Sequence, residues 1–378
     1  MKLSFNKFKR LSNEQERKIK SEMSSEDTGV IHLDDVTHFY QNDSSPTIEN
    51  LNLRIKHGEF ISILGESGAG KTTTLRMIAG FEKISSGYLR IGGQLVGSNF
   101  LHVPPNHRNL GVVFQDYALF PHMTVYKNIE FGISKLEENK KDIINNILSM
   151  VGMPGYENKY VHELSGGQQQ RVAIARAIAI NPIALLLDEP FSNLDRVLGR
   201  ELRKDIKKIS TNTETTTILV THDREEALAI SDRVAVVSNR KILQIDTPEH
   251  IYNNPLTPDV AKLVGPCDFI QGNYNKNYVE TSFGKFGTKF LEKIDNSEEV
   301  LVLIRPSDVN LSPSSTNDKN ALGRVISREY KGEYDEYEII SESGEIIHSR
   351  VNNLEKFSID SKVFVNMSNE RSVLVYKK

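Results

Sequence analysis

Apolar and polar positions alternate in blocks over residues 29–265. Short, nearly continuous apolar runs occur at Val30–Tyr40, Leu51–Ile55, Phe60–Leu64, Ala184–Leu187, Thr217–Val220 and Val234–Val237. Between them, apolar residues recur at helical spacing, as in Lys71–Ala79 and in the stripe Ile143, Ile144, Ile147, Leu148 and Val151. Continuous apolar runs are typical of strands that are buried on both faces. Their alternation with helices predicts an α/β domain whose sheet is covered by helices.

The pattern changes twice further along the chain. From about residue 115 to residue 180 it is richer in helix and lacks clear core strands, which predicts a helical subdomain within the α/β domain. After Gly265 and Pro266, turn residues separate short runs at Val300–Arg305, Gly323–Ser327, Tyr334–Ile340, Ile346–Val351, Val363–Val365 and Val373–Tyr376. Short alternating runs predict a small all-β domain over residues 266–378, with a loop at Ser312–Asn320.

Residues 1–28 fit neither pattern. They are highly charged and contain few aliphatic side chains. So little apolar surface does not offset the entropy cost of ordering a chain, and we expect a disordered extension. The whole chain of 378 residues suits two domains, at 29–265 and 266–378.

Charge and cysteine content narrow the classes of function. The net charge of −3 gives no electrostatic footprint for nucleic acid, so we expect no nucleic-acid partner. A single cysteine excludes an internal disulfide and a cysteine-based zinc site, and it indicates a reducing compartment. No segment reaches the roughly 20 apolar residues of a membrane span, and the first residues do not resemble a signal peptide. If the protein works at a membrane, other chains must supply the spans.

The first motif with a clear chemical meaning lies between the apolar run that ends at Leu64 and the helix predicted from Lys71. It matches the G-x-x-x-x-G-K-[ST] phosphate-binding loop. Glycines let backbone N–H groups point at phosphate oxygens, the lysine reaches the β- and γ-phosphates, and the hydroxyl ligates Mg²⁺. The candidate cofactor-binding residues are Gly65, Glu66, Ser67, Gly68, Ala69, Gly70, Lys71, Thr72 and Thr73.

Two acids follow a second apolar run. Leu185–Leu187 is followed by Asp188, Glu189 and Pro190. An acidic pair after a strand is usually a solvated turn, but beside a phosphate-binding loop a catalytic interpretation is favoured. Asp188 is then expected to hold Mg²⁺ together with Thr72. Glu189 is expected to orient and deprotonate the attacking water.

A third motif contains a hydroxyl and two glycines directly before a helical pattern. It reads Leu164, Ser165, Gly166, Gly167 and Gln168. Free backbone N–H groups at a helix N-terminus form an anion site, so one chain carries two candidate phosphate sites. Contacts from two chains that close over one nucleotide would use both.

Together these three motifs make the chain resemble the ABC ATPases, in which LSGGQ is the defining signature. The resemblance covers residues 30 to about 264, and it implies a P-loop ATPase that binds ATP and Mg²⁺. It also implies a head-to-tail homodimer in which Ser165 and Gly167 contact the γ-phosphate held by the partner. Further positions that match the family pattern are Gln115 (Mg²⁺ and water contact), Asp195 (dimer-crossing loop), His222 (γ-phosphate switch) and Tyr40 (adenine stacking).

Some positions admit a competing interpretation or depart from the family pattern. Phe39 is also aromatic, and aromatic residues at strand ends often belong to the core, although the family pattern favours Tyr40. Glu66 and Ala69 depart from residues common in the family, but neither change removes a ligand group. The segment from Tyr117 to Met123 falls where the family meets a coupling helix of its membrane subunits, and packing within the helical subdomain is the alternative for some of its residues.

The branch of the family is indicated by two features, the lack of a fused membrane span and the β-rich tail. In both features the chain resembles the ATPase subunits of bacterial importers, which are separate chains and carry an OB-like regulatory domain as their tail. Within that group, the residues around Ser165 and His222 look most like the ferric-iron importers. The implied partners are integral membrane permease subunits and, through them, an extracytoplasmic substrate-binding protein. The implied location is peripheral, on the cytoplasmic face of the cell membrane.

Other functions stay open at this point. The cargo could be a polyamine, phosphonate, sulfate or sugar rather than iron. An exporter subunit is possible, and so is a non-transport ABC ATPase of translation or DNA repair. Translation-type members usually carry two cassettes, whereas this chain has one. The tail could also serve only for dimerisation.

Overall fold

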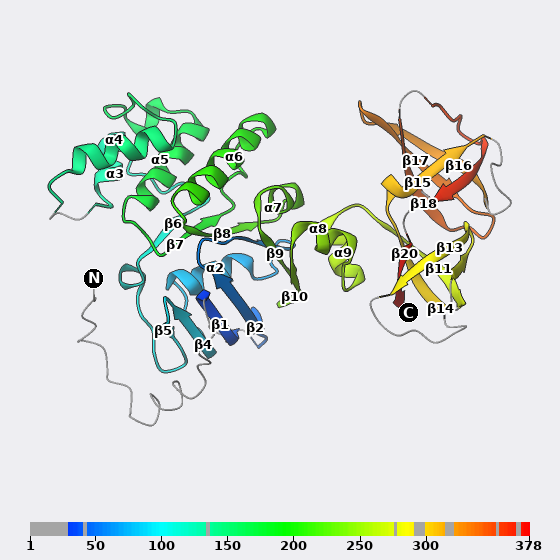
Figure 1. Ribbon diagram of the computed structural model, residues 1–378, viewed down its shortest axis with the longest axis horizontal. Coiled ribbons are helices and arrows are strands. Elements are labelled where there is room, and N and C mark those ends of the chain that lie inside the picture. The colour runs from blue at the N-terminus through cyan, green and yellow to red at the C-terminus, as the bar shows by residue number, and fades with distance from the viewer. Residues whose placement is uncertain are drawn as a thin grey trace.

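The fold is taken from a computed structural model of the full chain. It describes residues 29–378 except 41–43, 134–136, 276–277, 291–298, 314–320, 353–354 and 368–371. The expected extension over residues 1–28 and most of the expected loop at 312–320 lie outside the described residues. In the part that is described, no helix combines the length and apolar character that a membrane crossing would require. Figure 1 shows an α/β part and a β-rich part joined by two short helices.

A six-stranded sheet forms the centre of the α/β part, in the order β10-β9-β3-β8-β7-β6. All neighbours in it are parallel except β9 and β10. The central strands β3, β7 and β8 are buried at every position, as continuous apolar runs require. The strands are β3 (Phe60–Leu64), β6 (Leu110–Val113), β7 (Ala184–Asp188), β8 (Thr216–Thr221), β9 (Arg233–Ser238) and β10 (Lys241–Asp246).

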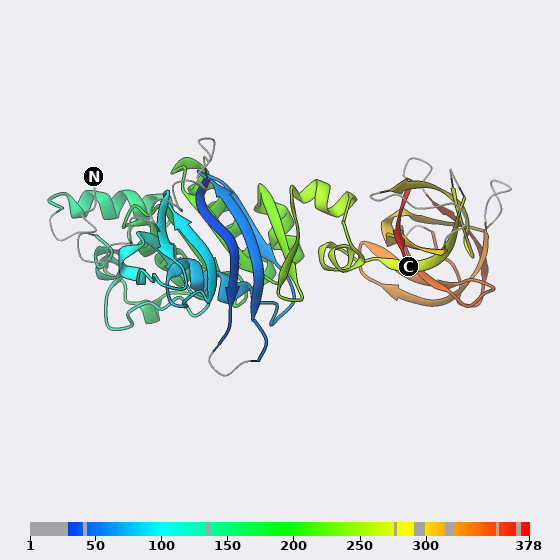
Figure 2. The ribbon, with the colours of Figure 1, turned by 90° about the horizontal axis from the view of Figure 1, so that it is seen from below.

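A second, antiparallel sheet packs beside it, in the order β2-β1-β4-β5. Its blue strands are prominent in Figure 2. One hydrophobic core joins this sheet to helix α2 (Lys71–Ala79) and to the central sheet. The strands are β1 (Gly29–His38), β2 (Ile48–Lys56), β4 (Ser86–Ile91) and β5 (Gln94–Gly97).

Helices cover the other face of the central sheet. Between β6 and β7 lie α3 (Val125–Glu130), α4 (Lys140–Met150) and α5 (Gly166–Ile178), which share one core with α6 (Arg196–Asn212). The expected stripe on α4 is real, since Ile144, Ile147 and Leu148 are its buried side chains. After β8, α7 (Arg224–Ile230) leads into β9. No strand is described between β6 and β7, in agreement with the helical character of that segment.

The β-rich part consists of a closed five-stranded barrel and a five-stranded sheet. The barrel runs β11-β12-β13-β20-β14 and the sheet runs β15-β19-β16-β17-β18. A single core of alternating side chains fills both. Their bounds are β11 (Asp268–Asn275), β12 (Tyr278–Thr281), β13 (Gly284–Phe290), β14 (Glu299–Ile304), β15 (Val309–Ser312), β16 (Ala321–Tyr330), β17 (Tyr334–Ile340), β18 (Ile346–Asn352), β19 (Lys362–Met367) and β20 (Val373–Lys377).

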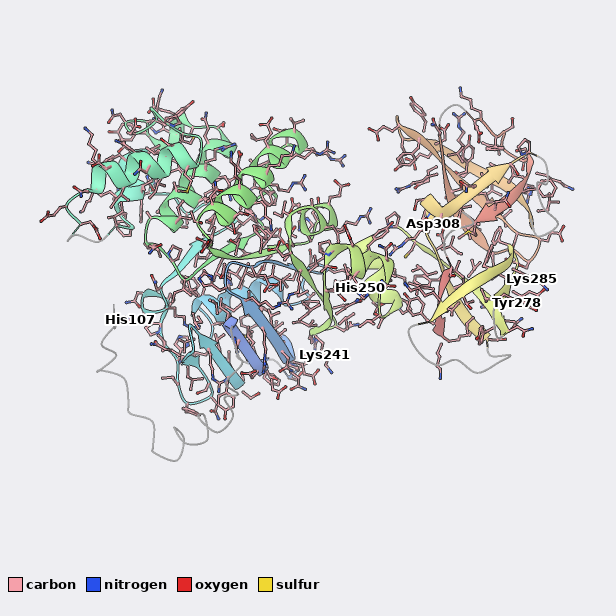
Figure 3. The ribbon with its side chains drawn as sticks, viewed as in Figure 1. His107, Lys241, His250, Tyr278, Lys285 and Asp308 are labelled. Atoms are coloured by element: carbon pink, nitrogen blue, oxygen red, sulfur yellow. The ribbon has the colours of Figure 1, made fainter. Side chains whose placement is uncertain are left out.

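Two helices, α8 (Pro248–Asn253) and α9 (Pro258–Val264), connect the parts. Figure 3 labels His250 on α8 and Asp308 of the β-rich part, which mark the two sides of this joint. The guanidinium of Arg305, 5% exposed, donates to the carbonyl oxygens of Ala261, Gly265, Pro266 and Tyr252. The Tyr376 hydroxyl donates to the carbonyl oxygen of Pro255 at 2.9 Å. Both side chains come from the barrel and donate hydrogen bonds to the main chain of the connecting segment.

Candidate nucleotide site

The expected phosphate and carboxylate groups lie at the carboxyl ends of adjacent parallel strands. β8 lies between β3 and β7, and Leu64 is aligned with Thr221 in the register. The phosphate-binding loop follows β3, Glu189 follows β7, and His222 follows β8. Open parallel sheets bind ligands outside the carboxyl ends of their strands. The topology therefore brings three segments, which are far apart in the sequence, to one edge.

The phosphate-binding loop needs glycine for two reasons. Gly68 and Gly70 have φ of 81° and 96°, in the left-handed region that other residues rarely adopt. In addition, a Cβ on Gly70 would stand 2.3 Å from Cδ1 of Ile48, so β2 closes over the loop. Gly70 is the N-cap of α2, and the free N–H groups of the first turn face the loop.

The Lys71 side chain is buried against the phosphate-binding loop. It is 4% exposed, and Nζ donates to the Glu66 carbonyl oxygen at 2.8 Å. Burial lowers the pKa of Lys71, while the charges of Glu189 and Asp188 oppose that shift. A buried ammonium with a single described hydrogen bond retains donors for phosphate oxygens. The geometry suits the role that the sequence predicts for this residue.

Thr72 and Asp188 meet across the site. The Thr72 hydroxyl donates to Oδ1 of Asp188 at 3.0 Å. Asp188 is 8% exposed, and burial raises its pKa, against the Thr72 hydrogen bond, with the Glu189 charge adding to the rise. A hydroxyl and a carboxylate are hard oxygen donors of the kind that Mg²⁺ prefers. This pair therefore fits the expected metal position.

Glu189 and His222 form the next contact. Nδ1 of His222 lies 3.1 Å from Oε2 of Glu189. Glu189 has φ of 45°, a left-handed conformation that is uncommon for a side chain of this kind, and its N–H donates to the Val220 carbonyl oxygen. Backbone strain of this type collects at functional sites, where surrounding structure maintains it. The strained turn directs the Glu189 carboxylate toward β8 and away from the core.

Tyr40 lies just beyond the end of β1, which the sequence pattern had extended by two residues. Its hydroxyl bonds to Oγ1 of Thr73 at 3.1 Å, and its ring meets the His38 ring edge-on at 4.8 Å. The ring is 36% exposed, and that of Phe39 is 41% exposed. Only Tyr40 has a described contact with the helix that begins at the phosphate-binding loop, which favours it over Phe39 as the base-stacking residue.

The LSGGQ residues form a helix start at a different place. Ser165 and Gln168 make a capping box on α5, in which Gln168 Oε1 accepts from the Ser165 N–H at 3.0 Å. Gln168 Nε2 also donates to the Tyr156 hydroxyl. A Cβ on Gly167 would stand 2.6 Å from Leu198, and Gly166 is exposed. The Ser165 and Gln168 side chains thus stabilise their own helix, and no described hydrogen bond joins them to the phosphate-binding loop.

Gln115 and Asp195 make hydrogen bonds within their own chain that the sequence did not predict. The exposed Gln115 follows β6, and its carbonyl oxygen accepts from Nδ2 of Asn193 at 3.2 Å. Asp195 is the N-cap of α6 and accepts from the N–H groups of Val197 and Leu198. An acid directly before a helical pattern is a recognisable capping signal. Asn193 gave no such signal, because its partner is 78 residues away.

Comparison with known proteins decides the family. The ABC transporter family model matches residues 48–192, and the TOBE domain model matches residues 302–375. A spermidine/putrescine import ATP-binding protein of Borrelia garinii is 42% identical over 306 residues, covering 80% of this chain and 86% of that protein. The protein of the same name from Mesoplasma florum is 37% identical over 358 residues, covering 93% and 99%. The chain belongs to the ATP-binding subunits of ABC transporters.

Solved ABC cassettes agree on the fold. A dimeric, post-hydrolysis ATP-binding cassette bound to ADP and phosphate is 32% identical, with a TM-score of 0.51 over 58% of this chain and 98% of that chain. A Clostridium perfringens component of a transporter complex is 26% identical, with a TM-score of 0.55 over 63% and 94%. The predicted fold class, a P-loop ABC ATPase followed by a small OB-like domain, is confirmed. ATP hydrolysis coupled to transport is likewise the activity of this family.

The expected subgroup needs correction. The family signature does not separate cargo classes, because the ATP-binding subunit does not touch the cargo. The relatives described above are named for spermidine and putrescine, and neither is named for ferric iron. The ferric-iron expectation is therefore unsupported, and the polyamine alternative is favoured.

Proposed function

We propose that this protein is the ATP-hydrolysing subunit of an ABC importer for polyamines of the spermidine and putrescine class. Support comes from relatives bearing that name, which match it across both the ATPase and the β-rich domain. The match includes residues well outside the shared nucleotide motifs, since it spans 80–93% of the chain. Similarity of that extent is the reason for preferring polyamines to iron.

In the proposed site, this chain's own residues bind the triphosphate and hold a water for attack. Lys71 and the backbone of residues 65–73 bind the phosphates, and Tyr40 stacks on the base. Thr72 and Asp188, 3.0 Å apart, would hold Mg²⁺ with Gln115, and the ion would neutralise phosphate charge. Glu189 orients and deprotonates the water, and His222 keeps its carboxylate in position.

The second half of each site is proposed to come from another copy. Ser165, Gly166, Gly167 and Gln168 start α5 away from the phosphate-binding loop of their own chain, with Ser165 and Gly166 exposed. Asp195 starts α6 in the neighbouring loop. A head-to-tail homodimer would place these helix starts against the nucleotide of the partner, which supplies anion-binding N–H groups. The dimeric cassette with ADP and phosphate supports this arrangement.

The proposed contact with the permease subunits lies between Tyr117 and Phe131. The buried Asn128 holds this segment through the main chain of Phe120, Met123 and Thr124. Phe120 packs on Phe131 at 4.7 Å, and Phe131 is 67% exposed. An exposed aromatic side chain beside an ordered loop is typical of a protein interface. It would place the subunit peripherally on the cytoplasmic face of the membrane, with a substrate-binding protein on the far side.

The observation that carries the proposal is the Glu189–His222 contact beside the Asp188–Thr72 pair. Glu189→Gln keeps the shape of the side chain but removes the base. We expect ATP binding to persist and hydrolysis to fall by about 100-fold or more, the usual contribution of a positioned general base. Phosphate release and nucleotide binding by the purified full chain would measure both. Glu280→Gln, on the barrel surface, is the matched control and should leave both unchanged.

Cargo is tested in two strains, one that carries the wild-type chain and one that carries Glu189→Gln. Uptake of labelled spermidine and putrescine should depend on the wild-type chain and fail with Glu189→Gln, whereas uptake of ferric iron should be equal in both. Loss of iron uptake alone would reject polyamines as the cargo. Normal turnover by Glu189→Gln would remove Glu189 from its proposed role.

A further inference from the structure

One buried amide in the ATPase domain has no described partner. Gln170 lies in the second turn of α5 and is 0% exposed, yet neither Oε1 nor Nε2 makes a hydrogen bond within the described part of the chain. A buried amide without partners is costly, and native proteins rarely retain one. Its neighbours on α5 are apolar core residues. The Gln170 amide is therefore expected to find its hydrogen-bond partner in another conformation of the protein.

A second unsatisfied group lies over the same strip of α5. The Tyr117 hydroxyl is buried and makes no hydrogen bond of normal geometry within the described residues. It stands 3.9 Å from the place where a Cβ on Gly166 would be. Gly166 and Gln170 are four residues apart and share one face of the helix, and helical side chains lean toward the N-terminus. The Gln170 side chain is therefore directed toward the turn that Tyr117 covers.

Tyr117 is the point where three segments meet. Gln115 precedes Tyr117 in the chain. The Asn193 side chain binds the Gln115 carbonyl oxygen and also contacts the Tyr117 hydroxyl. Leu194 is 3.5 Å from the Cβ position of Gly166. Each segment carries a residue assigned to ATP in the proposed function. We call Tyr117, Gln170 and Asn193 the Tyr117 junction.

The main chain at the junction is fixed from the α5 side. Tyr117 and Ala118 both have positive φ, 64° and 45°. Arg176 of α5 donates to both of their carbonyl oxygens, at 3.1 and 2.7 Å. Two adjacent left-handed residues are maintained only by such contacts. With the backbone of Tyr117 held, a bond between the Gln170 amide and the hydroxyl requires a movement of the first turns of α5.

We propose that Gln170 is a positioning residue of the ATPase, whose amide binds the Tyr117 hydroxyl when the dimer closes on ATP. This inference rests on the proposed function. The bond couples the helix that carries Ser165 to the loop that carries Gln115. It forms where the buried Gln170 amide is unsatisfied and where the Tyr117 hydroxyl has only a contact of poor geometry with Asn193, so closure satisfies the amide.

The test uses Gln170→Leu, Tyr117→Phe and the double variant in the full chain. Gln170→Leu removes a buried polar group without a described partner, so its melting temperature should equal or exceed that of the wild type. Tyr117→Phe removes only a contact of poor geometry with Asn193, so its melting temperature should stay close to that of the wild type. The kcat for ATP should nevertheless fall about two- to tenfold, as expected for one lost hydrogen bond, with KM within twofold. The double variant should be no slower than the slower single variant, because the two groups share one bond.

A matched control has the opposite signature. The Tyr337 hydroxyl, buried in the β-rich domain, accepts from the Phe357 N–H at 3.2 Å. Tyr337→Phe should therefore lower the melting temperature and leave kcat unchanged. Unchanged kcat in both junction variants, or multiplicative losses in the double variant, would overturn the pairing. Normal ATP hydrolysis by the Glu189→Gln variant would instead overturn the proposed function, so the two failures are distinguishable.

Discussion

At the scale of single residues, the site keeps charges where the fold disfavours them. Asp188 is almost fully buried at the end of β7, where desolvation raises its pKa and the Thr72 hydrogen bond only partly compensates. Lys71 is buried nearby, and desolvation lowers its pKa. Groups kept at such a cost are typical of binding sites, because a ligand supplies the missing interactions. In the proposed site, the protein without nucleotide would therefore carry a stability penalty that Mg·ATP would relieve.

Asp188→Asn tests whether the buried charge of Asp188 lowers stability and supports nucleotide binding. The amide keeps the size of the side chain but removes the buried charge, so we expect the variant without nucleotide to melt about 2–4 °C higher per kcal/mol gained in a chain of this size. The added stability that Mg·ATP gives the wild type should be largely lost, since binding to the native state is its source. Thermal denaturation with and without Mg·ATP measures both effects.

A control and a contrary result are available. Asp360→Asn changes an exposed carboxylate on the β-rich domain and should affect neither measurement. If Asp188→Asn keeps the full stabilisation by Mg·ATP, then Asp188 does not hold the ion.

The residues proposed to bind phosphate carry short sequence motifs, because their spacing is set by local geometry. Gly65 to Thr72 form one turn, and Ser165 to Gln168 form one helix start, so short motifs describe them. Asn193 and Gln170 could not be found in this way. Their significance depends on contacts, or on missing contacts, with segments that lie dozens of residues away, and a single sequence does not show such pairings.

At the scale of elements, the prediction succeeded where an apolar run or a clear alternation marks the strand or helix, and failed where strands are short or interrupted. The helix at Lys71–Ala79 and the strand at Tyr334–Ile340 match α2 and β17 at both ends. Strands β4, β5 and β11–β13 gave no usable pattern. β5 has four residues, too few for a period to emerge, and the buried face of β11 is interrupted by Gly272.

Strand β11 of the barrel is tied to β18 of the adjoining sheet through one histidine. His348 Nδ1 lies 2.8 Å from Asp268, and its N–H donates to the same carboxylate. Glu338 lies 3.6 Å from Nε2. Partial burial lowers the His348 pKa, but the Asp268 hydrogen bond and the charges of Asp268, Glu338 and Glu336 outweigh it, and the net pKa is raised. The charged imidazolium is thus the form that the fold prefers.

The sign of the pH dependence follows from this shift. Because the folded state holds its proton more tightly than the unfolded state, stability from His348 is complete below the unfolded pKa of 6.5 and is lost as pH rises through the folded value. His348→Gln should therefore lower the melting temperature more at pH 5.5 than at pH 8.5. Thermal scans at both values measure the difference. An equal loss at both pH values would contradict a charged His348, and His107→Gln, far from this pair, is the control.

At the scale of the whole molecule, Arg305 determines how the β-rich domain is attached. Its guanidinium binds four carbonyl oxygens and stacks 4.4 Å from the centre of the Tyr252 ring. Arg305→Met would leave several of these buried acceptors unsatisfied, at about 1–3 kcal/mol for each one that water does not reach. We expect lower stability in urea and faster proteolysis near Gly265. Arg324→Met, an exposed arginine on β16, should change neither.

The contrary result for the joint is equally clear. If Arg305→Met is cleaved no faster than the wild type, the apolar contacts of α9 with Leu303, Leu374 and Tyr376 are sufficient to attach the domain.

The way in which Arg305 and Tyr376 hold the connecting segment has an evolutionary consequence. Both side chains bind carbonyl oxygens, which every amino acid possesses, so these bonds themselves do not require particular side chains in the segment from Pro255 to Pro266, apart from Gly265, where a Cβ would stand 2.6 Å from Tyr252. A joint of this kind tolerates recombination: a chimera that brings its own barrel, with an arginine and a tyrosine at these two places, would find its docking groups already present. New tails, and with them new means of control, could be exchanged onto the same ATPase provided that they also keep the apolar contacts that Leu303, Leu374 and Tyr376 make with Ala261.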